Sequence, residues 1–126
     1  MSSPKRIISK LKQRFARMKG HPLTKTQPYK ALWRYVYLHL YFVVYKQYRH
    51  SWIGNLQLDI QKGDAGIIGN VYYGLYEYSE SLFVLHYLRA DDYFLDVGAN
   101  LGHYSLLAAG ITHCRTITLE PVPATF

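Results

Sequence analysis

The sequence predicts an α/β fold in which a parallel sheet follows a basic helical arm. Residues 93–97 form an apolar, strand-like run, followed by a glycine-containing loop and a helix-like stretch at residues 104–109. A second apolar run at residues 116–119 then indicates a neighbouring parallel strand. Charge predicts the arm, because the first 58 residues contain twelve Lys or Arg and no acid, whereas the remainder contains three basic and eight acidic residues.

The start of the arm has the pattern of an amphipathic helix. Ser3 and Pro4 suit an N-cap and a first helical position, and Gly20 and Pro22 would end the helix. Its apolar residues recur at helical spacing: Ile7, Leu11, Phe15 and Met18. Such a helix can lie on an anionic membrane surface, pack on its own protein or stay partly disordered. Nucleic-acid binding is the least favoured interpretation, because the basic residues surround no recognition motif.

Residues 29–50 predict a second, aromatic-rich helix. Its uncharged centre at residues 35–45 is too short to cross a bilayer, which takes about 20 apolar residues. Its tyrosines better suit a helix that lies at a membrane interface or packs in the core. No small-residue cleavage site follows it, so a secretory signal is not indicated. We therefore expect a cytoplasmic protein, with peripheral membrane attachment as an alternative.

The middle of the chain predicts small connecting elements. Alternating apolar residues at 56–60, followed by turn residues at 62–66 and the pair Ile67 and Ile68, predict a hairpin. Residues 79–88 predict a helix that leads into the first strand of the sheet. A single cysteine excludes an intramolecular disulfide, and the six histidines lack a metal-binding spacing, so we expect no structural metal.

The loop after residue 97 has the pattern of a cofactor site. Gly98 and Gly102 allow a sharp turn and a close approach of backbone to ligand, and the helix that follows points free N–H groups at the loop. Glu120 lies 24 positions after Asp96, at the carboxyl end of the next strand. An acid there can accept hydrogen bonds from both hydroxyls of a ribose.

Asp96 indicates which cofactor suits this loop. Asn100 stands where a dinucleotide-binding G-x-G-x-x-G loop would have its second glycine, and Asp96 would repel a pyrophosphate. S-adenosylmethionine instead carries a sulfonium and an ammonium, which an acid attracts. The pattern favours this methyl donor over a dinucleotide, and a nicotinamide-dependent oxidoreductase is a weaker alternative.

The segments DVGANLGHYSLLAA, LEPVPATF and the upstream YYGLYEYSES together resemble the FkbM family of methyltransferases over roughly residues 56–126. The resemblance implies the Rossmann-like sheet of class I methyltransferases and O-methylation of a small molecule or a sugar. It implies that the methionine part of S-adenosylmethionine is cradled by Asp96, Gly98, Asn100 and Gly102. It further implies that Glu120 holds the ribose and that Glu77 borders the donor pocket.

Several of these residues also have purely structural interpretations. Asp96 could end a strand and cap the next turn, and Glu120 could be a surface strand end. Asn100 could serve only because asparagine tolerates a left-handed backbone. His103 replaces an expected aromatic or aliphatic residue, and we expect it to pack while partly exposed. Glu77 could act as a base, yet a pocket position suits it better, so the sequence assigns no catalytic residue.

We therefore expect two regions, a basic, tyrosine-rich helical arm at residues 1–50 and the N-terminal part of a methyltransferase domain at residues 51–126. The resemblance implies seven strands in the complete sheet, and this sequence reaches the end of the second. The expected fold is thus an incomplete Rossmann-like sheet, and we expect a fragment that is inactive alone. The alternative is a noncatalytic basic interaction or membrane-surface protein that retains half of such a fold.

Overall fold

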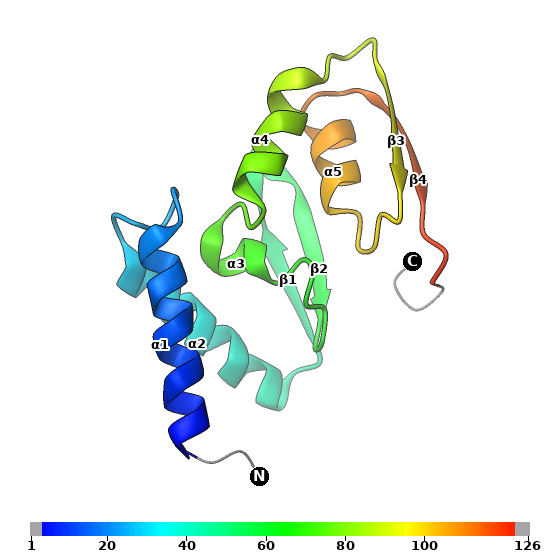
Figure 1. Cartoon of the computed structure of the whole chain (residues 1–126). Helices are drawn as coiled ribbons and strands as arrows, with labels where there is room; N and C mark the ends of the chain where they lie inside the picture. Colours follow the sequence, from blue (N-terminus) through cyan, green and yellow to red (C-terminus); the bar gives the residue numbers. More distant parts are fainter. Residues whose placement is uncertain (1–3, 123–126) are drawn as a thin grey trace.

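The structure, a computed structural model, describes residues 4–122 and has a mixed α/β fold (Figure 1). The α/β class expected from the sequence is confirmed; Ser3, the expected N-cap, lies outside the described residues. The elements in chain order are α1 (Pro4–Gly20), α2 (Pro28–Val44), β1 (Gln47–Ser51), a 3-10 turn (Ile53–Asn55), β2 (Gln57–Gln61), α3 (Gly69–Tyr73), α4 (Tyr78–Tyr87), β3 (Tyr93–Val97), α5 (His103–Gly110) and β4 (Arg115–Leu119).

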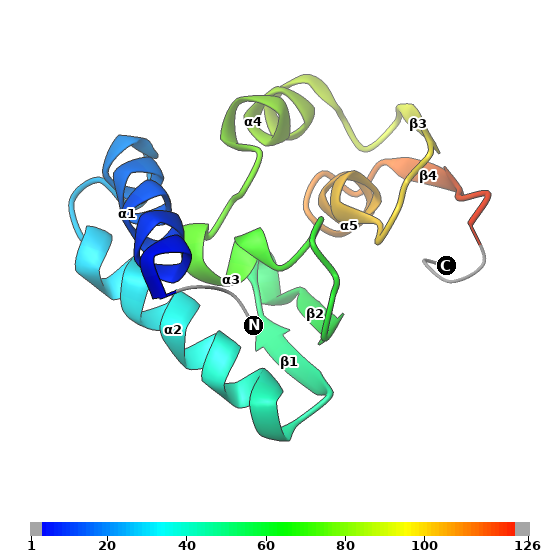
Figure 2. The ribbon, with the colours of Figure 1, turned by 60° about the horizontal axis from the view of Figure 1, so that its bottom comes forward.

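Helices α1 and α2 pack against each other, and α3 and the β1–β2 hairpin separate them from β3 and β4 (Figure 2). The predicted apolar face of α1 is buried to different extents along the helix. Met18 is fully buried, Leu11 and Phe15 are half-buried, and Ile7 is exposed. Thr24, in the connection to α2, donates a hydrogen bond from Oγ1 to the Met18 carbonyl at 2.6 Å. The C-terminal half of α1 therefore packs on its own protein.

The second helix is shorter than the sequence predicted. It ends at Val44 instead of residue 50, and β1 pairs antiparallel with β2. Tyr48 and His50 are half-buried opposite Ile60 and Leu58, so pairing with the following strand β2 overrides the helical pattern in this segment. The expected boundary between residues 50 and 51 falls inside β1.

The predicted hairpin exists with a different partner. We expected residues 56–60 to pair with the segment at residues 67 and 68, but β2 pairs with the preceding strand β1. Gly54 and Asn55 take positive φ angles of 57° and 65° in the tight connection, which Asn tolerates better than most residues. The turn residues at 62–66 instead lead into α3. The alternation of apolar and polar residues predicted the strand β2, but no local pattern indicated that it pairs with the preceding segment.

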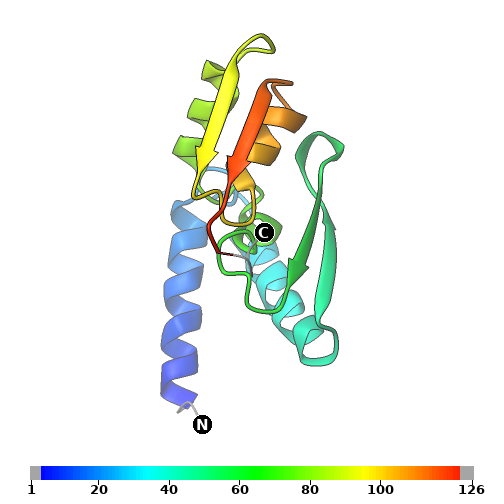
Figure 3. The same ribbon diagram turned by 90° about the vertical axis from the view of Figure 1, so that its right-hand side faces the viewer.

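Strands β3 and β4 are parallel, as predicted, with Asp96 opposite Thr118 and Val97 opposite Leu119. Helices α4 and α5 lie on one side of this two-stranded sheet (Figure 3). Alternation along the strands leaves an apolar set exposed to solvent: Tyr93, Leu95, Val97, Ile117 and Leu119.

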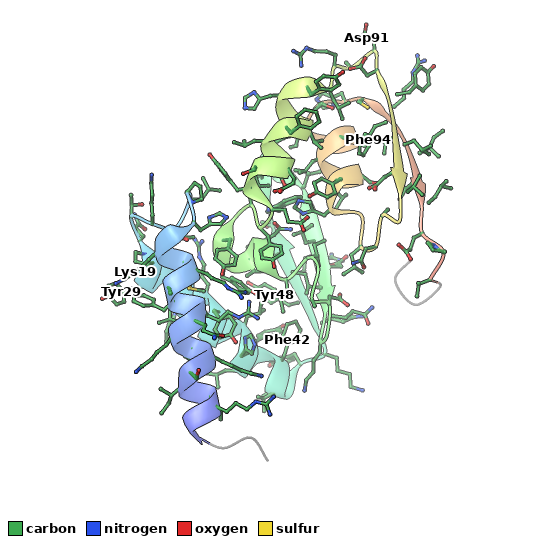
Figure 4. All side chains as sticks on the ribbon, viewed as in Figure 1. Lys19, Tyr29, Phe42, Tyr48, Asp91 and Phe94 are labelled. Atoms are coloured by element: carbon green, nitrogen blue, oxygen red, sulfur yellow. The ribbon has the colours of Figure 1, made fainter. Side chains whose placement is uncertain are left out.

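One hydrophobic cluster joins the arm to the rest of the chain. It contains Leu38 and Phe42 from α2, Leu58 and Ile60 from β2, and Leu107 from α5. Figure 4 shows Phe42 and Tyr48 in the region between α2 and the hairpin. The basic arm is therefore built into the same core as the predicted cofactor loop. No helix within residues 4–122 is both long and apolar enough to cross a membrane.

Candidate functional site

The loop between β3 and α5 turns tightly because three of its residues have left-handed backbones. Gly98, Asn100 and Gly102 have φ angles of 78°, 53° and 73°. Both Gly98 N–H and Ala99 N–H donate hydrogen bonds to the Leu119 carbonyl, at 2.8 and 3.1 Å. The loop is thereby held against the carboxyl end of β4. Asn100 does adopt the left-handed conformation that the sequence left open as its role.

Glu120, the predicted ribose-binding acid, lies at this loop. Its Oε2 accepts a hydrogen bond from the Asn100 N–H at 2.6 Å, and its Oε1 accepts one from the Val122 N–H at 2.8 Å. The structure thus brings together two predicted site residues that lie 20 positions apart.

Asp96 is buried and joins β3, α5 and β4. Its Oδ2 accepts hydrogen bonds from the Ser105 N–H at 3.1 Å and from Ser105 Oγ at 2.6 Å. Thr118 Oγ1 in turn donates to Ser105 Oγ at 2.8 Å. Asp96 therefore makes the kind of helix-capping contact that its structural interpretation required. The sequence did not indicate Ser105 as its partner, although a hydroxyl in the first turn of the helix was a signal for it.

Two adjoining clefts lie at the carboxyl ends of β3 and β4, and Gly98 lines both. The first has a volume of about 220 Å³, and the predicted site residues on it are Glu77, Asp96, Gly98 and Asn100. The second has a volume of about 460 Å³ and is lined by Val97, Gly98, Leu119, Glu120 and Pro121. Gly102 lines neither cleft and instead precedes α5. Within the described part of the chain, no Lys or Arg lines either cleft.

Glu77 lies across the first cleft from the start of α5. Tyr104 donates a hydrogen bond from its hydroxyl to Glu77 Oε2 at 2.7 Å. Burial raises the pKa of Tyr104, and the hydrogen bond to Glu77 raises it further, so the phenol stays protonated at neutral pH. The sequence predicted Glu77 at the pocket but gave no indication of Tyr104 as its partner.

His103 also lines the first cleft and has hydrogen bonds at both ring nitrogens. Nδ1 lies 2.9 Å from Asn70 Nδ2, and Nε2 lies 2.8 Å from Ser81 Oγ. The Asn70 amide orientation is set by its Oδ1, which accepts a hydrogen bond from the Tyr76 N–H at 2.9 Å. Asn70 therefore donates to His103 Nδ1, and Nε2–H donates to Ser81.

Burial lowers the pKa of His103, although the nearby carboxylates of Glu77 and Asp96 oppose this shift. Its ring also packs 5.4 Å from that of Trp52. We expected partly exposed packing for His103, and the half-buried ring agrees. Asn70 and Ser81 lie 33 and 22 positions away, so no local sequence pattern indicated them.

Comparison with known proteins finds no matching family model, no matching curated protein and no matching solved structure. Within residues 4–122, no three His, Cys, Asp or Glu side chains are grouped so as to hold a metal ion.

Proposed function

We propose that this chain carries the methyl-donor site of an S-adenosylmethionine-dependent methyltransferase, with β3 and β4 as the first two strands of a Rossmann-like sheet. One observation carries the proposal. Three carboxylates, those of Glu77, Asp96 and Glu120, surround two adjoining clefts at the carboxyl ends of parallel strands, and no Lys or Arg lines these clefts in the described chain. Ligands of open parallel sheets bind at this end of the strands.

The clefts suit the two halves of S-adenosylmethionine. The methionine half, with its ammonium and sulfonium, fits the cleft that Glu77 and Asp96 line. The hydrogen bonds of Asp96 both involve Oδ2, so Oδ1 can accept one from the ammonium. The adenosine half fits the larger cleft, where Glu120 would accept hydrogen bonds from the ribose.

The loop backbone also fits a ligand. Gly98 lines both clefts, and a Cβ built at this glycine would meet no atom within 4 Å, so open space lies beside the backbone. Its φ angle of 78° is one that residues with a side chain rarely adopt. A ligand can therefore approach the main chain closely at this position.

S-adenosylmethionine, when bound, supplies a methyl group already activated by the sulfonium. The residues of this chain would hold and orient it, since methyl transfer depends mainly on the alignment of donor and acceptor. We propose a hydroxyl of a small molecule or a sugar as the acceptor, which rests on the FkbM-like segments. No catalytic base is assigned.

A nicotinamide dinucleotide suits the same clefts less well. Its pyrophosphate carries negative charge, and at Gly98 it would lie beside Asp96 and Glu120 without a lining Lys or Arg in the described chain. Nicotinamide adenine dinucleotide is therefore the informative control ligand.

Calorimetric titration of the purified chain tests the proposal. We expect saturable binding of S-adenosylmethionine and none of the dinucleotide. Glu120→Ala should weaken methyl-donor binding by about tenfold or more, because it removes a charged hydrogen-bond acceptor. Asp91→Asn removes an exposed acid that lines neither cleft and should leave the affinity unchanged. A folded chain that does not bind S-adenosylmethionine, or a Glu120→Ala variant that binds it equally well, would overturn the proposal.

A further inference from the structure

Helix α2 carries apolar side chains on two opposite faces. One face is buried in the core and contains Ala31, Leu38 and Phe42. The other is exposed, and we call it the outer face of α2: Tyr29, Trp33, Tyr37, Leu40, Val43 and Val44. At 100° per residue, these exposed positions centre on the side of the helix opposite the buried ones. Trp33 and Val44 are 66% and 74% exposed.

The outer face runs the length of the helix. From Tyr29 to Val44 it extends over about 22 Å, at 1.5 Å per residue. A helix that faces water on one side normally places polar residues there, so an apolar outer face indicates a further contact. Trp and Tyr are the side chains enriched where a protein meets the headgroup region of a membrane.

Basic residues border the outer face. Lys30 and Arg34 are both exposed on α2, and Lys30 precedes Trp33 by about one helical turn. On the α1 side, the ring of Phe15 packs 5.0 Å from that of Tyr29, and the Lys19 ammonium lies 5.0 Å from the Phe15 ring. Figure 4 shows Lys19 and Tyr29 at the same end of the helix pair.

The charge of this region indicates an anionic partner. The first 58 residues contain twelve Lys or Arg and no Asp or Glu. Clusters of such cations beside a membrane-facing helix are attracted to anionic lipids, at about 1 kcal/mol for each cation near the surface. Single-stranded nucleic acid would also attract them, yet the aliphatic end of the outer face, at Leu40 and Val44, offers bases nothing to stack on.

We propose that the outer face of α2 docks on the surface of an anionic phospholipid bilayer. The helix lies in the plane of the interface, with Trp33 and Leu40 among the upper acyl chains and Lys19 and Lys30 at the lipid phosphates. The sequence-based expectation allowed membrane contact through the arm, on the apolar face of its first helix or at an interfacial second helix. The structure leaves the outer face of α2 exposed, whereas Met18 of α1 is buried. The docking does not depend on the proposed methyl-donor site.

Intrinsic fluorescence provides a local probe of docking. Of the two tryptophans, Trp33 is 66% exposed and Trp52 is 8% exposed, so lipid contact should change the emission of Trp33. The whole chain is mixed with vesicles of phosphatidylcholine alone or of phosphatidylcholine with phosphatidylserine. We expect a blue shift of Trp33 emission and co-sedimentation only with the vesicles that contain phosphatidylserine, and loss of both in high salt.

Matched variants separate this face from other apolar surfaces. Leu40→Gln keeps the Trp33 probe and should weaken vesicle binding by about tenfold, because it removes one aliphatic side chain that the bilayer would bury. Lys30→Glu should weaken it by about fivefold or more. The control is Phe83→Gln on α4, where Phe83 is 65% exposed, and it should bind vesicles like the unmodified chain.

Circular dichroism would establish that each variant is folded, since all three positions are exposed. Absence of vesicle binding by the folded chain would overturn the proposal. So would binding that Leu40→Gln leaves unchanged, or a Trp33 emission shift produced by single-stranded nucleic acid and not by anionic vesicles.

Discussion

Asn70 donates a hydrogen bond to Nδ1 of His103 across 2.9 Å, and this contact determines the protonation state of the imidazole. The side-chain oxygen of Asn70, Oδ1, accepts a hydrogen bond from the Tyr76 N–H. The Asn70 side-chain amide therefore presents only N–H groups to the ring. A proton on Nδ1 would place two donors face to face. The contact and the burial of the ring both favour neutral His103.

Stability should therefore depend on pH through His103. Its pKa in the folded chain is below the value of about 6.5 expected when unfolded, so below pH 6.5 the unfolded state binds more protons. The free energy of unfolding should be fully retained above pH 6.5 and should fall as the pH drops toward the folded pKa. Urea unfolding measured between about pH 8 and pH 5, on either side of the unperturbed histidine pKa, gives the slope of the free energy of unfolding against pH.

His103→Gln should reduce this pH slope without abolishing it. His50 also has a lowered pKa, caused by burial and by the charge of Arg34, and contributes with the same sign. A His50→Gln variant and the double variant separate the two contributions. An unchanged slope in His103→Gln would contradict a neutral, buried role for His103.

Ser105→Ala should destabilise the fold by about 1–3 kcal/mol, because it removes the hydroxyl that joins Asp96 to Thr118 in a buried site. Urea denaturation at pH 7.5, about one unit above the usual histidine pKa, avoids the titration of His103. Ser79→Ala, at an exposed serine of α4, is the matched control and should change the midpoint little. Equal effects of the two substitutions would rule out a bridging role for Ser105.

Tyr104→Phe should weaken binding of S-adenosylmethionine by about two- to tenfold, since it removes the phenol that positions Glu77 beside the first cleft. This prediction rests on the proposed donor site and is measured by calorimetric titration. Tyr87→Phe, which alters an exposed tyrosine of α4, serves as the control. An unchanged affinity of Tyr104→Phe for S-adenosylmethionine would argue against a role for Glu77 in binding the methyl donor.

Gly69→Ala should destabilise the fold by about 1–3 kcal/mol through overpacking. A Cβ at Gly69 would lie 2.5 Å from Tyr76 Cγ and 2.9 Å from Tyr76 Cβ, and Tyr76 is held in place because its backbone N–H donates a hydrogen bond to Asn70 Oδ1. A Cβ at Gly20 would meet no atom within 4 Å, so Gly20→Ala should change the stability of the fold little. Thermal unfolding of both variants compares the effects, and a stable Gly69→Ala variant would show that Tyr76 can move.

The site was predictable where it depends on local backbone geometry. Gly98 and Asn100 adopt left-handed backbones, and Glu120 reaches the loop from the end of the next strand, because parallel strands bring their carboxyl ends to one edge. The partners of His103 were not predictable. Asn70 and Ser81 come from α3 and α4, and only packing brings those helices to the start of α5.

Local periodicity and composition were enough to predict helix α1, the charge asymmetry and the succession of strand, loop, helix and strand that forms the sheet. Contacts between segments, which no local pattern shows, set the end of α2 at Val44 and the pairing of β2 with the strand before it. The same contacts bury part of the apolar face of α1 and leave the outer face of α2 exposed. Helical periodicity identifies an apolar face, whereas the neighbour that covers it depends on long-range packing.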